Sequence, residues 1–161
     1  MRAKFATSDL MDAHPDAPCC DTQFRIWGKR RFFSGRIRTV RCLEDNVLVK
    51  KLFSQASDGD VLVVDGAGSL HCALMGDVIA ALGMRSGWAG AIINGAVRDS
   101  VALDTLEFGV KALGTNPRRS GKRGEGAIDV PVCFGGATFV PGHYLYSDED
   151  GIVILAGPVA I

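Results

Sequence analysis

The stretch Asp65-Gly-Ala-Gly-Ser-Leu-His-Cys-Ala-Leu-Met-Gly-Asp77, continued by Asn94-Gly-Ala-Val-Arg-Asp99, decides the fold that this sequence predicts. The apolar run Val61-Leu-Val-Val64 leads into it and is typical of a strand buried on both faces. A helical pattern follows, and a second apolar run then ends in a glycine turn that delivers Arg98 and Asp99. Strand, glycine loop, helix, strand and polar loop, in that order, predict an α/β fold with a site where the strands end.

Charged side chains occupy loop or helix-start positions around this stretch. Asp77 opens the predicted helix, and Arg98 with Asp99 follows the second strand. Two carboxylates and a guanidinium so placed can hold a metal ion and an anionic substrate together. Each residue also has a structural interpretation, because Arg-Asp pairs are usually surface ion pairs or helix caps and an acid in a first turn offsets the helix dipole. Asp104 alone would be a solvated helix residue.

The composition predicts one domain that spans residues 1–161. Of these residues 47% are hydrophobic and 22% charged, and a chain of this length buries about two-thirds of its unfolded surface. Eighteen basic residues balance eighteen acidic ones, so no overall field attracts nucleic acid or a membrane. No apolar run approaches the roughly 20 residues of a membrane span, and no signal sequence is evident. We therefore expect a cytoplasmic protein.

The cysteines predict free thiols. Their number is odd, and no pair has the C-x-x-C spacing of a zinc or redox motif. They are Cys19, Cys20, Cys42, Cys72 and Cys133. In a reducing compartment such residues are buried or idle more often than they form a disulfide framework.

Periodicity and turn residues predict the remaining elements. Helices are expected after the capping residues 7–9, after residues 44–46, over 76–85 and over 99–108. Strands are expected at 24–27, 31–43, 61–64, 91–93, 109–113, 130–134, 137–140, 144–146 and 152–155. On the helix at 76–85, Val78, Ala81 and Leu82 share an apolar face, and Gly83 and Gly87 are expected to unwind its end.

A basic loop is expected at residues 115–126. Its segment Pro117-Arg-Arg-Ser-Gly-Lys-Arg-Gly-Glu125 carries four positive charges, as a nucleic-acid surface can. No aromatic residue accompanies them for stacking on bases. A solvated or anion-facing loop is therefore favoured over direct nucleic-acid binding.

Five motifs together resemble the RraA-like family, which includes the regulator of ribonuclease E activity and the 4-hydroxy-4-methyl-2-oxoglutarate aldolases. They are Val61-Leu-Val-Val-Asp-Gly-Ala-Gly-Ser69, Asn94-Gly-Ala-Val-Arg-Asp99, Gly124-Glu-Gly126, Phe134-Gly-Gly136 and Tyr146-Ser-Asp-Glu-Asp-Gly-Ile-Val153. The resemblance runs from about Thr7 to Leu155. It implies a swivelling β/β/α-type domain of the α/β class, usually assembled as a homotrimer with sites between subunits.

The resemblance also separates enzymes from regulators. Metal-dependent aldolases of the family carry the pattern D-x20-R-D-x(2–4)-E/D. The ribonuclease regulator lacks the full set of these residues. This sequence has Asp77, twenty intervening residues, Arg98 and Asp99, and then Asp104 after four more. The resemblance therefore implies a metal-dependent aldolase. Longer aldolases of the family supply a further acidic residue to a neighbour's site from extra C-terminal sequence, and none is expected from a chain that stops at Ile161.

The reaction so implied is cleavage of 4-hydroxy-4-methyl-2-oxoglutarate, or a related 4-hydroxy-2-oxo acid, to pyruvate, with oxaloacetate decarboxylation as a second activity. Both leave a pyruvate enolate, whose negative charge Mg²⁺ or Mn²⁺ can stabilise. These ions take oxygen ligands and commonly keep several waters. We expect Asp99 to bind the metal, and Asp77 and Asp104 to hold metal-bound waters that move protons.

Arg98 and a helix start are expected to bind the substrate. The planar guanidinium of Arg98 would point at the 2-oxo oxygen, where negative charge develops. The substrate carboxylate would lie on the backbone N–H groups of the first helical turn, from Gly76, Asp77, Val78 and Ile79. Gly76 would also let the ligand approach closely.

Other chemistries are disfavoured. A Schiff-base aldolase needs a buried lysine, and Lys111, the one lysine in a predicted strand, is expected to face outward. A hydrolytic triad lacks its G-x-S-x-G elbow. Gly68-Ser-Leu-His71 loosely resembles a phosphohistidine loop, but the partner domains are missing, so His71 is expected to line a loop. The open alternative is a non-enzymatic inhibitor of ribonuclease E that acts through its trimer surface.

Overall fold

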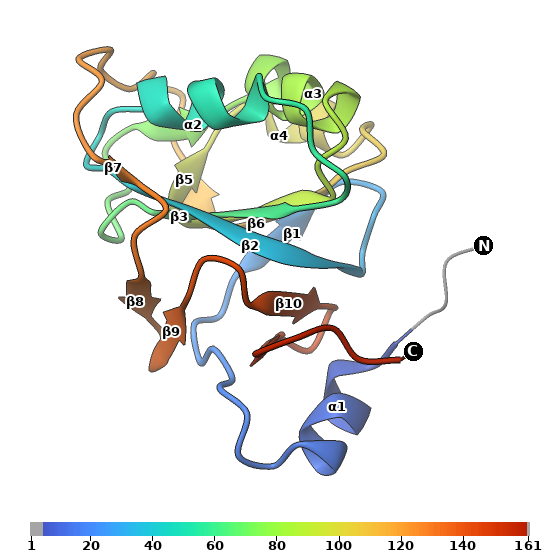
Figure 1. Ribbon diagram of the computed structural model, residues 1–161. Helices are drawn as coiled ribbons and strands as arrows, with labels where there is room; N and C mark the ends of the chain where they lie inside the picture. Colours follow the sequence, from blue (N-terminus) through green and yellow to red (C-terminus); the bar gives the residue numbers. More distant parts are fainter. Residues whose placement is uncertain (1–4, 161) are drawn as a thin grey trace.

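The structure is a computed structural model that describes residues 5–160. Its described elements are four helices and eleven strands (Figure 1). The helices are α1 (Thr7–Ala13), α2 (Val47–Phe53), α3 (Asp77–Arg85) and α4 (Ser100–Leu103). The strands are β1 (Arg25–Trp27), β2 (Phe33–Arg41), β3 (Val61–Asp65), β4 (Ala73–Met75), β5 (Gly90–Val97), β6 (Gly109–Thr115), β7 (Ala127–Ile128), β8 (Val132–Phe134), β9 (Ala137–Phe139), β10 (Tyr144–Ser147) and β11 (Ile152–Leu155).

Parallel strands form the centre of the larger sheet. The strand order is β1-β6-β5-β3-β2-β10-β11, with β4 paired to β5 and β7 to β2. Neighbours among β2, β3, β5 and β6 are parallel, and residues 61–64 of β3 are fully buried, as the apolar run predicts. Parallel neighbours need crossover connections, which place α2, α3 and α4 on one face of the sheet (Figure 1).

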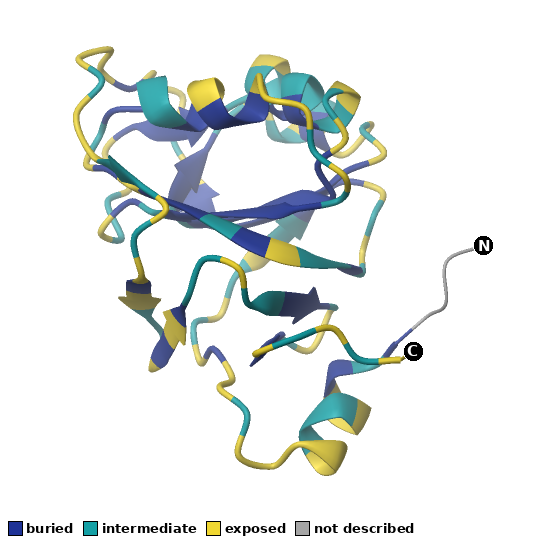
Figure 2. Cartoon of the chain, viewed as in Figure 1, coloured by how far each residue is buried: buried dark blue, intermediate teal, exposed yellow. Residues whose placement is uncertain are grey.

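A second β layer covers the opposite face. β2 serves both layers, because its residues 33–36 pair with β10 while residues 37–41 pair with β3. The β8–β9 hairpin and α1 lie on the same side as β10 and β11 (Figure 1). Buried residues concentrate in the central strands, between the helices and the second β layer (Figure 2). Helices, central sheet and second β layer confirm the expected α/β fold of the β/β/α type.

The stretch that decides the fold contains more strand than its sequence predicts. The loop expected between residues 65 and 77 includes β4, which pairs with the end of β5. β5 runs through Val97 instead of ending at Ile93, because Ala96 and Val97 pair with β6 as well as with β4. In place of the expected glycine turn, the strand continues, and its pairing with β6 shifts in register between Ile93 and Ala96. β7 was not predicted, and α4 is shorter than the helix expected over 99–108.

Helix α3 packs through only part of the predicted apolar face, because Leu82 packs against the core and Val78 does not. The side chain of Val78 is 72% exposed, whereas Ala80 and Gly83 are buried. Gly83 does not unwind the helix, because α3 continues to Arg85. A Cβ atom at Gly83 would lie 2.8 Å from the ring of Phe53, so the missing side chain lets α2 and α3 approach closely.

Lys111 is buried, contrary to the expectation that it faces outward. Its side chain is 3% exposed, and its ammonium group donates hydrogen bonds to the carbonyl oxygens of Asp148 and Gly151, in the turn between β10 and β11. Burial lowers the pKa of Lys111 from 10.5 to about 8, although the nearby carboxylate of Asp148 opposes that shift. The second β layer, which strand periodicity does not reveal, is what encloses this side chain.

Two further expectations concern the described chain as a whole. No described helix combines the length and apolar character that crossing a membrane requires. All five cysteines are free, as predicted, and Cys20, Cys42 and Cys72 are buried.

Candidate functional site

A cavity of about 270 Å³ lies where β4 and β5 end and α3 begins. The carboxyl ends of parallel strands share one edge of a sheet, which is where α/β folds place their sites. Six predicted residues line this cavity: Gly76, Asp77, Val78, Ile79, Arg98 and Asp99. Five lining residues were not predicted: Asn46, Lys50, Ala73, Arg119 and Lys122.

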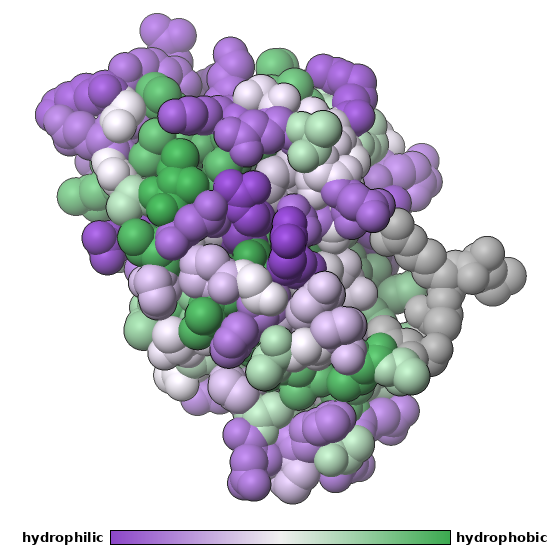
Figure 3. Space-filling model, in the orientation of Figure 1, coloured by the Kyte–Doolittle hydropathy of each residue, from purple (hydrophilic) through white to green (hydrophobic). Residues whose placement is uncertain are grey.

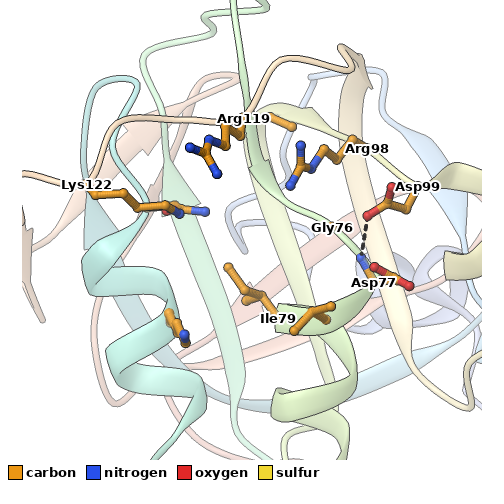
Figure 4. Close-up of a pocket in the computed structure, with 11 residues that line it drawn as sticks. Gly76, Asp77, Ile79, Arg98, Asp99, Arg119 and Lys122 are labelled. Carbon is orange, nitrogen blue, oxygen red and sulfur yellow. Dashed lines mark hydrogen bonds between the residues drawn. The ribbon is translucent and has the colours of Figure 1, made fainter.

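Gly76 and Asp99 form the tightest part of the cavity. The backbone N–H of Asp77 donates to Asp99 Oδ2 over 3.2 Å, which holds this carboxylate at the start of α3 (Figure 4). A Cβ atom at Gly76 would lie 2.4 Å from the same oxygen. Asp99 itself adopts a left-handed backbone conformation, with φ of 59°, which carries an energetic cost for a residue other than glycine. The glycine and the unusual backbone together fix where this carboxylate lies.

Arg98 bridges two segments that face the cavity. Its backbone N–H donates to the carbonyl oxygen of Met75 over 3.0 Å, at the end of β4. Its guanidinium donates to the carbonyl oxygen of Pro117 over 3.4 Å, in the basic loop. The side chain is partly buried and points into the cavity (Figure 4). A permanently charged fork therefore lies beside the two carboxylates, as the sequence predicts.

A second group of cations lines the cavity away from the carboxylates. We name Lys50, Arg119 and Lys122 the basic wall; Figure 4 shows Arg119 and Lys122 across the cavity from Asp77 and Asp99. Burial lowers the pKa of Lys122, and the nearby charges of Lys50, Arg119 and Arg98 lower it further. Arg119 and Lys122 belong to the loop for which the sequence favoured a solvated or anion-facing role. Nothing in the sequence connects Lys50 of α2 to that loop.

Asp45 and Asn46 attach the basic loop to the start of α2. The Asp45 carboxylate accepts backbone N–H groups from Val47, Arg123 and Gly124, over 3.1, 2.6 and 3.0 Å. Burial would raise the pKa of Asp45, but these hydrogen bonds hold it below its ordinary value. The Asn46 side chain accepts a hydrogen bond from Lys122 and donates one to the carbonyl oxygen of Leu74 over 3.1 Å. The position of the loop is therefore fixed relative to both α2 and β4.

Asp104 does not join the other predicted residues. It is exposed just beyond α4 and is not among the residues that line the cavity. Its Oδ1 accepts the backbone N–H of Gly28 over 3.0 Å, which ties the end of α4 to the loop after β1. Within this chain Asp104 therefore has a structural contact instead of a place beside Asp77 and Asp99.

His71 also lies outside the cavity. His71 is exposed in the loop before β4, as expected, with Arg118 Nη1 3.0 Å from its Nδ1. The same guanidinium nitrogen donates to the His71 carbonyl oxygen over 2.8 Å. Asp65 accepts hydrogen bonds from the backbone of Ala67 and the side chain of Asn94, each over 3.0 Å, and so orients the separate turn at residues 66–68.

The donor set of the cavity suits a hard divalent cation. Among the described residues there is no group of three or more His, Cys, Asp or Glu side chains arranged to hold a metal. The cavity offers the carboxylates of Asp77 and Asp99. Mg²⁺ prefers such oxygen donors and keeps several waters, so one or two carboxylates are sufficient protein ligands. Zinc sites of three or four nitrogen and sulfur ligands have no counterpart in this cavity.

The sequence also resembles solved structures over nearly its full length. It is 44% identical to the structure described as S-adenosylmethionine:2-dimethylmenaquinone methyltransferase from Geobacillus kaustophilus HTA426, with 96% of this chain and 97% of that one covered and a TM-score of 0.94. It is 41% identical to the RNA-processing inhibitor RraA from Thermus thermophilis, with 99% and 96% covered and a TM-score of 0.94.

A more distant relative is Streptomyces coelicolor RraAS2, described as an unusual member of the RNase ES inhibitor RraA protein family. It is 26% identical, with 92% of this chain and 77% of that one covered and a TM-score of 0.74. The family match itself, to RraA-like (Aldolase/RraA), extends over residues 7–154. That family includes aldolases as well as inhibitors of RNA processing. Because the match takes in nearly every residue that the structure describes, the chain belongs to the RraA-like family.

Proposed function

We propose that this protein is a divalent-metal-dependent lyase that cleaves 4-hydroxy-4-methyl-2-oxoglutarate, or a related 4-hydroxy-2-oxo acid, to pyruvate. The observation that carries the proposal is the meeting of Asp77, Arg98 and Asp99 in one cavity at the start of α3. A 2-oxo acid carries two oxygen groups that a cation and an arginine can bind together. The same arrangement suits oxaloacetate decarboxylation, which leaves the same enolate of pyruvate.

Breaking the bond between C3 and C4 sends its electrons toward the 2-oxo oxygen, while the proton of the C4 hydroxyl passes to a water that Asp77 would hold. The enolate then takes a proton back from this water to form pyruvate. The Arg98 guanidinium, a planar donor beside the cavity carboxylates, stabilises the negative charge that develops on that oxygen. The first-turn N–H groups of Val78 and Ile79 have no helical acceptor and bind the substrate carboxylate. The N–H of Asp77 is already donated to Asp99, so it holds that side chain instead.

Asp99 would bind the cation, and Asp77 would face it from the first turn of α3. When bound, Mg²⁺ or Mn²⁺ supplies Lewis-acid stabilisation of the charge on the substrate oxygens. Asp104, which the family pattern includes, acts by holding the loop after β1 through Gly28. The lyase would act in the cytoplasm.

Release of pyruvate from purified protein tests this proposal. We expect turnover with Mg²⁺ or Mn²⁺, and none after EDTA treatment until metal is restored. Arg98→Ala and Asp99→Asn should each lower kcat about 10²- to 10³-fold, the usual cost of removing one group that stabilises transition-state charge. Asp16→Asn removes an exposed carboxylate outside the cavity and serves as the matched control. Full activity in EDTA, or in Asp99→Asn, would contradict the proposal.

A second function has separate support. The Thermus relative at 41% identity is described as an RNA-processing inhibitor, so we also propose that this chain binds ribonuclease E and lowers its activity. A purified mixture analysed by size-exclusion chromatography and an RNA-cleavage assay tests this proposal. Binding and inhibition that persist in Asp99→Asn would show that regulation is independent of the lyase site.

Homotrimer formation belongs to the same proposal. Val78 on α3 and Val101 on α4 flank the predicted site residues and are 72% and 83% exposed. Contact with another subunit would remove both side chains from water. Light scattering should give about three times the monomer mass of 17.1 kDa, and a monomer at micromolar concentration would contradict this assembly.

A further inference from the structure

The charges in the cavity are separated into two ends. Asp77 and Asp99 lie at the start of α3, and Lys122 and Arg119 lie across from them, with Arg98 between (Figure 4). Four cationic side chains therefore share one cavity of about 270 Å³ with two carboxylates. A single divalent cation at the acidic end would raise the positive excess further. The cationic end needs an explanation of its own.

The cations at that end lack ionic partners within the protein. In the described chain, the salt bridges involve Arg31, Arg36, Arg38 and Arg123, and none includes Lys50, Arg98, Arg119 or Lys122. Lys122 instead donates to the neutral amide oxygen of Asn46. Burial lowers the pKa of Lys122, and so do the charges of Lys50, Arg119 and Arg98, which reflects their mutual repulsion. An anion placed among them would relieve that repulsion.

The basic wall is held by specific contacts. Asp45 accepts hydrogen bonds from the backbone N–H groups of the two residues that follow Lys122 in the chain. The Asn46 side chain accepts a hydrogen bond from Lys122 itself. Lys50 comes from α2, a separate element that the Asp45 and Asn46 contacts join to the loop. Hydrophilic side chains also gather over the loop at residues 118–126, at the upper left of Figure 3. Solvated lysines on a mobile loop would need neither the buried Asp45 nor the amide of Asn46.

We infer that the basic wall binds a second carboxylate of the substrate, on the carbon beyond the bond that breaks, and that Lys50 determines the preference for such dicarboxylates. The inference rests on the proposed lyase function, because the 2-oxo acid end is taken to lie at Asp99 and Arg98. One end of the cavity then binds the oxo acid, and the other distinguishes 4-hydroxy-4-methyl-2-oxoglutarate from substrates with one carboxylate. Pyruvate, which has no second carboxylate, would be bound more weakly than the intact substrate.

Lys50 is the most informative member to replace, because it makes no hydrogen bond to the loop that positions the others. The quantity to measure is the ratio of kcat/KM for 4-hydroxy-4-methyl-2-oxoglutarate to that for 4-hydroxy-2-oxopentanoate, which lacks the second carboxylate. In Lys50→Met this ratio should fall about three- to fivefold, as expected for an exposed charge pair. The fall should arise mainly through a higher KM for the dicarboxylate. Raising the ionic strength should shrink the ratio of the unmodified protein in the same direction.

Lys51→Met is the matched control. It removes the same charge from the neighbouring position of α2, but Lys51 does not line the cavity. An equal fall in both variants would mean that only overall charge matters, and this would overturn the inference. An unchanged ratio in Lys50→Met would overturn it as well.

A binding measurement separates this inference from the lyase proposal. Calorimetry with 2-oxoglutarate and 2-oxopentanoate, with and without Mg²⁺, compares two acids of equal chain length that differ in the second carboxylate. We expect 2-oxoglutarate to bind about fivefold more tightly, with the difference lost in Lys50→Met and kept in Lys51→Met. If neither hydroxy acid releases pyruvate but this difference is present, the lyase proposal fails and the carboxylate site stands. Equal affinities for the two acids would refute the site.

Discussion

Replacing Lys111 by methionine should change how the stability of this protein depends on pH. The lysine is 3% exposed, and its pKa is lowered from 10.5 to about 8, mainly by burial. Between these two values the unfolded chain binds a proton that the folded chain has lost, so stability rises with pH. The contribution is fully present above the unfolded pKa of 10.5 and is lost as the pH falls through about 8.

The size of this contribution follows from the shift. A difference of about 2.5 between the two pKa values corresponds to about 3 kcal/mol at full deprotonation, and to about 2 kcal/mol between pH 7 and pH 9.5. Burial also raises the pKa of Cys42 to about 12, which acts in the opposite direction at high pH. That effect is common to the unmodified protein and Lys111→Met, so it cancels in their difference. The ammonium hydrogen bonds to Asp148 and Gly151 are lost in the variant at every pH.

Urea unfolding of both proteins at pH 7, 8, 9 and 9.5 measures the effect. The free energy of unfolding of the unmodified protein, relative to that of Lys111→Met, should increase by about 2 kcal/mol across this range. Lys51→Met, which removes an exposed lysine, should follow the unmodified protein within about 0.5 kcal/mol. Two parallel curves for the unmodified protein and Lys111→Met would refute the assignment of a lowered pKa to this buried ammonium.

Three further substitutions test the geometry of the site and its support. Gly76→Ala places a carbon 2.4 Å from Asp99 Oδ2, so the carboxylate must move, and kcat/KM for pyruvate release should fall about 10²-fold while Tm changes little. Gly83→Ala forces a methyl group against Phe53 at 2.8 Å and should cost about 1–3 kcal/mol in urea unfolding, with pyruvate release retained in the folded fraction. Asp45→Ala leaves three backbone N–H groups without their acceptor and should lower the free energy of unfolding by about 3 kcal/mol. The KM for dicarboxylates should rise because the basic loop is held less firmly, and an unchanged KM would contradict this role.

Local signals in the sequence were sufficient for most of the central sheet. The run at residues 61–64 is uniformly apolar because β3 is covered on both faces. Burial on both faces can therefore be predicted from four consecutive residues. β4 and β7 were not predicted, because each is only two or three residues long and is recognised as a strand by its pairing, β4 with β5 and β7 with β2. The buried role of Gly83 in α3 was missed for a similar reason, because only the structure shows the ring of Phe53 of α2 beside it.

Contacts between distant residues were the part of the site that sequence could not supply. Asp77, Arg98 and Asp99 were predicted because a spacing pattern in one family joins them. Lys50 and Lys122 are separated by 71 residues and share no pattern, and contacts such as the hydrogen bonds of Asp45 and Asn46 bring them to one cavity. The same pattern gave Asp104 a place in the site, but the turn after α4 directs its carboxylate to Gly28. A spacing pattern thus selects a residue without indicating what that residue contacts.

The backbone at Asp99 favours a functional origin for this arrangement over a structural one. A left-handed conformation costs a non-glycine residue of the order of 1 kcal/mol, and glycine at this position would avoid that cost. The space that Asp99 Oδ2 occupies exists only because position 76, the N-cap of α3, has no side chain. The left-handed backbone of Asp99 and the missing side chain at position 76 therefore act on one carboxylate oxygen. Such a departure from local preference, with space left open for the side chain, is expected where a carboxylate must be held for chemistry, and an ordinary surface ion pair or helix cap would need neither feature.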